Sequence, residues 1–233
     1  MTASEPMTSP EPSGEELLRA TSAVRAFTSD PVDPALVHEL LDEARFAPSG
    51  GNRQPWRVVV LDDRDVRRRL GELMQPVWDD YIAAGAAGFT PFNVVDGDDA
   101  PAGTEHTSNA LLDTIEEVPV VLVVAADLRS VAVMDGSLER IPMTGGASIY
   151  PFCWSILLAA HRRGLGGVLT TFLSRVEPAA APLLGLPDHH ALAATMFLGW
   201  PQHRSTRLTR RAVAEFTTID RFDGGTFEPD AQA

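Results

Sequence analysis

The chain has 233 residues, of which 44% are hydrophobic and 22% are charged, proportions that are ordinary for a globular protein. Its formal net charge of -13 disfavours nucleic acid and anionic membrane as partners, and any bound phosphate would need a local cluster of arginines. Cys153 is the only cysteine, and neither a signal pattern nor a membrane-length apolar run is found, so we expect a cytoplasmic protein without disulfides.

The composition divides the chain into three parts. Residues 1–12 are rich in Ser, Pro and Glu and are predicted to be a disordered tail. Residues 13–222 are predicted to form the folded domain, and residues 223–233 a loose C-terminal tail.

Two helices are predicted before residue 50. Ser13-Gly14-Glu15-Glu16 fits a capping box and should begin a short helix. Asp33 and Pro34 fit the N-cap and first helical position, and apolar residues recur at helical spacing as far as Phe46. Arg25, between the two helices, is either a surface charge or a ligand for an anion.

The block from Ala47 to Trp56 links the second helix to a predicted strand and is rich in groups that both donate and accept hydrogen bonds. Two glycines within it permit close approach of the backbone, and Trp56 offers an apolar anchor. Such a block would suit the polar edge of a flat ligand. The alternative is an ordinary turn from helix to strand.

The middle of the chain contains fewer candidate functional residues. A strand is predicted over Trp56–Leu61, then a helix whose four arginines, Arg64, Arg67, Arg68 and Arg69, are read as a solvated face. The stretch from Tyr81 to Asn109 is predicted to be a long functional or mobile loop. His106 within this loop has no partner at metal-ligand spacing, so we predict no metal site.

The second half alternates apolar strands and helices. Buried strands are predicted over Val118–Ala126 and Ala193–Leu198. A broad apolar helix from Ile149 should end at Gly164, with Cys153 in its core-facing part. The glycine cluster of residues 164–167 follows a helix and precedes a strand, so it lacks the order of a dinucleotide motif but could lay backbone N–H groups against a ligand. A short helix is predicted near Pro178–Leu186.

Four arginines gather near the C-terminus, namely Arg204, Arg207, Arg210 and Arg211. They form either a solvated tail or an anion site. An amide-rich loop, a glycine-rich turn and arginines at both ends of the chain together suit flavin mononucleotide, FMN, which needs partners for its pyrimidine edge, its reactive N5 and its phosphate.

The order and spacing of five motifs resemble the FMN-dependent nitroreductase family. These motifs are residues 22–27, 47–56, 163–167, 198–201 and 210–216. The resemblance implies an α/β (α+β) fold of three layers, α-β-α, around a mixed, mainly antiparallel sheet. It also implies an intertwined homodimer with two FMN sites at the subunit interface.

The resemblance also implies roles for individual residues. Arg25 would contact the phosphate or the pyrimidine edge of the flavin. Arg207, Arg210 and Arg211 would hold the phosphate. The remaining flavin contacts implied by the family pattern are Pro48, Ser49, Gly50, Asn52, Gln54, Ser148, Leu169, Thr170 and Thr171.

This chain departs from the family pattern at two places. Thr21 and Ala23 occupy positions where members often carry an Arg and a Ser that bind phosphate, so the geometry or strength of FMN binding could differ. Thr170 and Thr171 stand where many members have an acidic residue or Gly followed by Gly.

The expected activity is an FMN oxidoreductase that uses NADH or NADPH to reduce a small-molecule acceptor such as a nitroaromatic or a quinone, with the cofactor carrying the chemistry. A positive charge from Arg25 would favour the reduced flavin anion. Two alternatives stay open: a flavin oxidase, desaturase or dehalogenase of a biosynthetic intermediate, and a non-catalytic flavin-binding protein.

Overall fold

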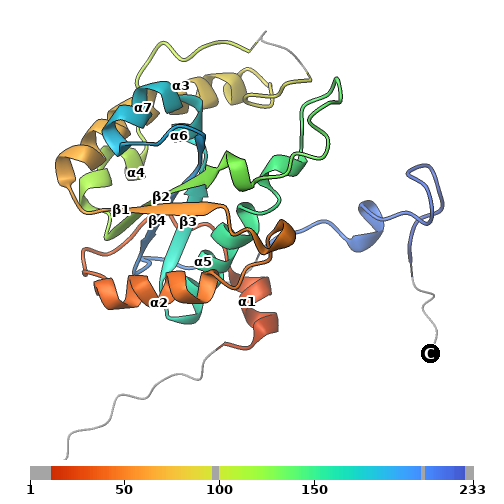
Figure 1. Cartoon of the computed structure of the whole chain (residues 1–233), viewed down its shortest axis with the longest axis horizontal. Coiled ribbons are helices and arrows are strands. Elements are labelled where there is room, and N and C mark those ends of the chain that lie inside the picture. Colours follow the sequence, from red (N-terminus) through yellow and green to blue (C-terminus); the bar gives the residue numbers. More distant parts are fainter. Residues whose placement is uncertain (1–11, 96–99, 206–207, 229–233) are drawn as a thin grey trace, which may run out of the picture.

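The computed structural model describes residues 12–95, 100–205 and 208–228 (Figure 1). Two helices, α1 and α2, precede strand β1, and the long helix α3 follows it. The main elements in chain order are α1 Gly14–Ala20, α2 Pro34–Ala44, β1 Trp56–Leu61, α3 Arg64–Ala86, α4 Ala110–Asp113, β2 Val120–Asp127, α5 Tyr150–Arg162, β3 Gly166–Thr170, α6 Phe172–Arg175, α7 Glu177–Leu184 and β4 His190–Gly199.

The helices cover both faces of one sheet, which gives the predicted three layers (Figure 1). Alternate residues of β2 explain this. Leu122 and Val124 pack toward α2 and α5, whereas Val121 and Val123 pack toward α3 and α7. All eight residues of β2 are buried, as expected for a strand covered on both faces.

The sheet has the strand order β1-β2-β4-β3, and every neighbouring pair is antiparallel. The parallel component that we detect in the described residues is a bridge between Ala23 and Gly167. β1 and β3 are therefore the two edges of the four-stranded sheet, which decides where the candidate site residues lie.

The predicted second helix and first strand are confirmed, and two contacts fix their positions. The ring of Trp56 stacks on Phe152 of α5, with centroids 4.7 Å apart. Glu43 at the end of α2 accepts hydrogen bonds from Arg162 and Arg163 at the end of α5. Gly164 then ends α5 with a φ of 84°, a conformation that favours glycine.

Two expectations for the middle of the chain were wrong. Helix α3 continues to Ala86 instead of ending before Tyr81, because alanines favour helix and Trp78 and Tyr81 pack on Phe172.

Arg67 is 8% exposed and does not belong to the solvated face. Its guanidinium donates to the Leu61 carbonyl, from Nε at 2.9 Å and Nη2 at 2.6 Å, and from Nη1 to Val118 O at 2.8 Å.

None of the helices in the described residues is both long enough and apolar enough to cross a membrane.

The Arg67 contacts generate a stability prediction. Arg67→Met should lower the free energy of unfolding by about 2–4 kcal/mol, because the carbonyls of Leu61 and Val118 lose their buried donor. Arg69→Met, on the exposed face of the same helix, should change it by less than about 0.5 kcal/mol. Urea denaturation of both variants measures the difference, and equal losses would contradict the role assigned to Arg67.

A buried carboxylate organises the loop between β2 and α5. Asp135 accepts hydrogen bonds from Met143 N at 2.8 Å, from the Thr144 hydroxyl at 2.6 Å and from Arg140 at 2.6 Å. These bonds, with that from the Met143 backbone foremost, hold the pKa of Asp135 well below its usual range. The loop leads directly to Ser148 and so positions it.

The lowered pKa fixes the direction of a pH effect. The Asp135 carboxylate contributes stability that is present above the unfolded pKa of about 4 and is lost as the pH falls toward the folded value. Asp135→Asn should therefore speed protease cleavage within residues 131–147 at pH 7 and reduce the acid dependence of that cleavage. Glu139→Gln, exposed in the same loop, is the control and should behave like the native chain.

Candidate functional site

The segment that carries Arg25 lies along the edge strand β3. The Val24 N–H donates to the Gly167 carbonyl at 2.9 Å. Gly166 allows this approach, because a Cβ there would lie 2.7 Å from a side-chain atom of Val24. Gly167 instead makes room for the sheet and α5, because a Cβ there would lie 2.4 Å from Leu198 and 2.9 Å from Leu157.

Arg25 opens onto a cavity of about 530 Å³, here called the Arg25 cavity. It lies beyond the C-terminal end of β3. The residues that line it are Arg25, Trp78, Tyr81, Ser108, Asn109, Ala110, Leu111, Leu169, Thr170, Thr171 and Phe172. The structure thus brings together four predicted site residues: Arg25 and the three that end β3.

The Arg25 cavity combines charge, polar groups and aromatic rings. The Thr170 hydroxyl is buried and has no hydrogen-bond partner among the described residues. Asn109 uses its side-chain oxygen to cap α4, so its amide nitrogen keeps two hydrogens for another partner. Trp78, Tyr81 and Phe172 form an aromatic wall, with Trp78 stacked on Tyr81 at 5.8 Å.

The other predicted ring contacts form a second group, residues 48–54, here called the amide loop. Gly50 N donates to the Ser148 hydroxyl at 3.0 Å, so Ser148 adjoins the loop. Gln54 N donates to the Ser49 hydroxyl at 3.0 Å, and the Gln54 side chain donates to the Asn52 side chain at 3.1 Å.

The backbone of the amide loop is held in an uncommon form. Asn52 and Gln54 have φ values of 53° and 48°, and Gly51 has 61°. Positive φ at two residues other than glycine is costly and is found where function requires it. All three residues are exposed, so their polar groups are available to a ligand.

The two groups do not share one cavity within a chain. The amide loop enters β1 at one edge of the sheet, whereas the Arg25 cavity lies at β3 on the opposite edge. Three strand spacings separate these edges, about 14 Å across the sheet. The chain therefore presents two polar half-sites that face different surroundings.

The C-terminal arginines do not reach either half-site. Arg210 donates to its own neighbour Thr209, and Arg211 is exposed, on a segment that extends away from the body (Figure 1). Arg207 lies outside the described residues. Arg204 folds back and donates to the carbonyls of Gly164 and Leu165 at the end of α5.

Thr21, one of the two family departures, points into the molecule. It is 6% exposed, and its hydroxyl lies 2.7 Å from Nδ1 of His161. Burial, with the nearby Arg204 charge, lowers the pKa of His161 and favours the neutral imidazole. Position 21 therefore serves packing in this chain, whereas Ala23 is exposed.

Cys153, predicted to be a core residue, is fully buried, and burial raises its pKa to about 12. Such a thiol is not a nucleophile at neutral pH. The described residues also contain no group of three or more His, Cys, Asp or Glu side chains that could hold a metal ion.

The aromatic wall and Asn109 escaped the sequence reasoning. Trp78 and Tyr81 are three residues apart, which places them on one face of a helix. The spacing of the two aromatic residues therefore indicates a shared helix face, but the Gly- and Ala-rich stretch after Tyr81 favours a loop. Asn109 had no such signal, because its place beside Arg25 depends on the whole fold.

The sequence is similar to a known family and to several known proteins. The model of the Nitroreductase family matches residues 18–200. The chain is 32% identical over 179 residues to 5,6-dimethylbenzimidazole synthase of Rhodospirillum rubrum, covering 77% of each chain. It is 27% identical over 229 residues to nitrobenzene nitroreductase of Ectopseudomonas oleovorans, covering 88% of this chain and 96% of that one.

The deiodinases are more distant relatives. Rat iodotyrosine deiodinase 1 is 24% identical over 193 residues, which cover 82% of this chain and 63% of the length of the relative. A solved iodotyrosine deiodinase bound to FMN and 3-iodo-L-tyrosine shares the fold with a TM-score of 0.63 at 20% identity, covering 89% of this chain and 99% of that one. Because the family model spans most of the sequence, the chain belongs to the nitroreductase family.

Proposed function

We propose that the chain is an FMN-dependent oxidoreductase that uses NADH or NADPH to reduce a small organic acceptor, a nitroaromatic or a quinone, and that it works as a homodimer. The observation that carries the proposal is the pair of complementary half-sites. The Arg25 cavity offers a cation and an aromatic wall, and the amide loop offers exposed donors and acceptors.

The residues present fit a flavin. The buried Thr170 hydroxyl lacks a partner in the described chain, and a bound ring with polar edges would supply one. Arg25 matches the pyrimidine edge or the phosphate, and the amide loop matches the ring from a second copy. Arg207, Arg210 and Arg211 remain the proposed phosphate ligands, because in a chain of net charge -13 a phosphate needs a local cluster of arginines.

The cofactor, when bound, would supply two-electron transfer between the nicotinamide and the acceptor. The residues of the chain would bind the cofactor and the acceptor and orient them. The Arg25 guanidinium would stabilise negative charge that develops beside it. Trp78, Tyr81 and Phe172 would exclude water and accept a planar acceptor by ring contact.

Titration with FMN tests the half-site at β3. Arg25→Gln should weaken FMN binding roughly tenfold, because one charge-assisted hydrogen bond is lost. Thr170→Val should weaken it severalfold. Thr195→Val is the matched control, since Thr195 pairs with Thr170 across the sheet and its hydroxyl also lacks a partner, but it does not line the Arg25 cavity.

The readout is the quenching of FMN fluorescence on binding. If Thr195→Val weakens binding as much as Thr170→Val, the effect belongs to the sheet and not to the cavity. Protein that takes up no FMN at all would contradict the proposed function.

Exposed apolar surface supports a homodimer. The segment after residue 208 leaves the body and exposes Phe216, Ile219, Phe222 and Phe227 (Figure 1). The body exposes Phe46, Trp154 and Met143 near α2 and α5. A lone chain would leave these side chains in water, and contact with a second copy would bury them.

Removing the C-terminal segment tests the dimer. A chain that ends at Arg204 should be monomeric and should bind FMN at least tenfold more weakly, because both the contact surface and the phosphate arginines are lost. Sedimentation velocity and FMN titration measure the two effects. A full-length chain that is monomeric at micromolar concentration and still binds FMN would overturn the proposed assembly.

The relative 5,6-dimethylbenzimidazole synthase favours one alternative, a flavin enzyme that oxidises or desaturates a biosynthetic intermediate. Mixing the FMN-loaded chain with NADH or NADPH without oxygen distinguishes the reductase from this alternative. Rapid bleaching of the flavin absorbance by NADH or NADPH supports the reductase. Slow bleaching by both, with fast reduction by an organic substrate, supports the alternative.

A further inference from the structure

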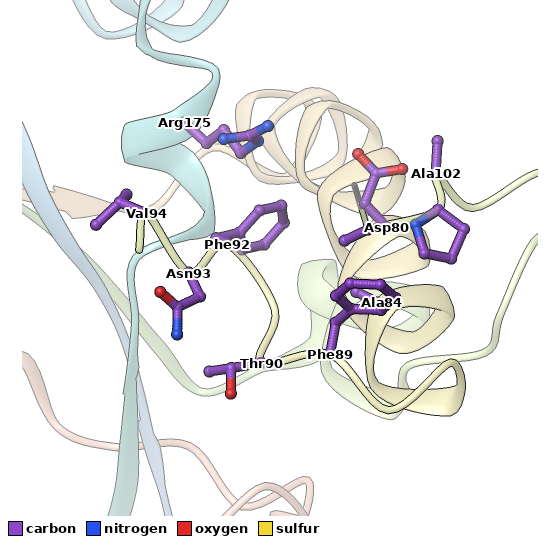
Figure 2. Close-up of a pocket in the computed structure, with 11 residues that line it drawn as sticks. Asp80, Ala84, Phe89, Thr90, Phe92, Asn93, Val94, Ala102 and Arg175 are labelled. Atoms are coloured by element: carbon purple, nitrogen blue, oxygen red, sulfur yellow. The ribbon is translucent and has the colours of Figure 1, made fainter. Parts of the chain in front are cut away.

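A second cavity, of about 390 Å³, lies between α3, α6 and the loop after α3 (Figure 2). Its wall is both polar and apolar, and two charged side chains enter it, Asp80 from α3 and Arg175 from α6. The other residues that line it are Ala84, Phe89, Thr90, Phe92, Asn93, Val94, Ala100, Pro101 and Ala102.

The two charges are held apart. The Arg175 guanidinium lies over the Phe92 ring, 4.4 Å from its centroid, and forms no ion pair with any described residue. Asp80 uses one carboxylate oxygen to accept the Gly103 N–H at 2.8 Å. Figure 2 shows Arg175 beside the Phe92 ring and Asp80 on a separate helix. A cation and an anion that share a small cavity without pairing suit a ligand that carries both charges.

Residues 103–107, which follow the lining residues Ala100–Ala102, are docked against α3. Gly103 packs so closely that a Cβ there would lie 2.4 Å from the backbone of Asp79. Asp79 in turn accepts the Thr107 N–H at 2.8 Å and the Gln75 side chain at 2.8 Å. These contacts hold the backbone around Gly103, and with it the hydrogen bond to Asp80, in a fixed place.

The second cavity neighbours the Arg25 cavity across a contacting pair of aromatic rings, Tyr81 and Phe92. Tyr81 lines the Arg25 cavity, and its ring lies 6.3 Å from Phe92 of the second cavity. The short helix α6 reaches both, with Phe172 in the first and Arg175 in the second. For a molecule with its ring against Tyr81 and Phe172, a substituent that passes the Tyr81–Phe92 ring pair would reach the cavity that holds Arg175 and Asp80.

Resting on the proposed function, we propose that the second cavity binds the zwitterionic head of the acceptor, and that the acceptor class includes aromatic α-amino acids. The carboxylate of the ligand would pair with Arg175, and its ammonium group would pair with the free oxygen of Asp80. A ligand with only a carboxylate would meet Asp80 as a like charge, which is why the pair favours a zwitterion.

The test uses the full-length, FMN-loaded chain and four ligands that share a nitrophenyl ring. 4-Nitro-L-phenylalanine carries both charges, 3-(4-nitrophenyl)propionate lacks the ammonium, 4-nitrophenethylamine lacks the carboxylate, and 4-nitrotoluene lacks both. Equilibrium binding is measured by quenching of tryptophan fluorescence without added nicotinamide, and kcat and KM are then measured with it.

Arg175→Met should raise the Kd of 4-nitro-L-phenylalanine and of the propionate roughly tenfold and leave that of the amine unchanged. Asp80→Asn, which keeps an acceptor for the Gly103 N–H, should raise the Kd of 4-nitro-L-phenylalanine and of the amine only. Neither variant should change the Kd of 4-nitrotoluene. Arg69→Met, an exposed charge on α3, controls for long-range electrostatics.

The proposal is overturned if 4-nitro-L-phenylalanine binds no more tightly than 4-nitrotoluene, or if its Kd is unchanged in both variants. If the enzyme reduces 4-nitrotoluene but neither variant changes the Kd of 4-nitro-L-phenylalanine, the zwitterion site is rejected and the proposed function stands. If both variants change the Kd values as expected but no ligand is reduced, the zwitterion site stands and the proposed function is contradicted. Arg175→Lys, which keeps the charge, should recover part of the lost affinity.

Discussion

The hydrogen bond from Val24 to Gly167 is the contact on which the candidate site depends. It holds the segment before α2 against the edge of the sheet and so places Arg25 at the end of β3. The segment can approach because Gly166 of β3 has no side chain. A larger residue at Gly166 would collide with Val24 and push the segment away, and Arg25 would lose its position beside Thr170.

The strand order then decides what one chain can do. Because β1 and β3 are opposite edges, the amide loop and the Arg25 cavity belong to different ends of the sheet. Neither half-site alone offers partners for both the ring edge and the phosphate of a flavin. The proposed dimer resolves this, since a symmetric contact would bring the amide loop of one copy to the Arg25 cavity of the other.

Much of the fold was predictable because apolar periodicity is strong in this chain. The strand Trp56–Leu61 and the helix that starts at Asp33-Pro34 follow from local pattern and capping alone. The prediction failed where tertiary packing overrides composition. In the sequence, nothing distinguishes Arg67 from Arg64, Arg68 and Arg69, which are exposed. Arg67 is buried because it donates to the backbone carbonyls of Leu61 and Val118, which only the fold brings close to it.

The candidate site was predictable in its parts and not in its arrangement. The amide loop was recognisable from residue types, whereas its bond to Ser148, 98 residues away from Gly50, was not. The aromatic wall was missed because Ala83, Gly85 and Ala86 suggested a loop, yet they complete α3. The role of Thr21 could not be read from sequence, because its partner His161 lies 140 residues away.

A subunit-mixing experiment tests the central claim that the FMN site is shared between two copies. One variant carries Arg25→Gln and Thr170→Val, and the other carries Ser49→Ala and Gln54→Ala, so that each lacks one half-site. After subunit exchange, the mixture should recover about a quarter of the native FMN sites, since half of the dimers are mixed and each has one intact site. If mixing restores no FMN binding, although exchange is verified by sedimentation of labelled chains, the shared site is contradicted.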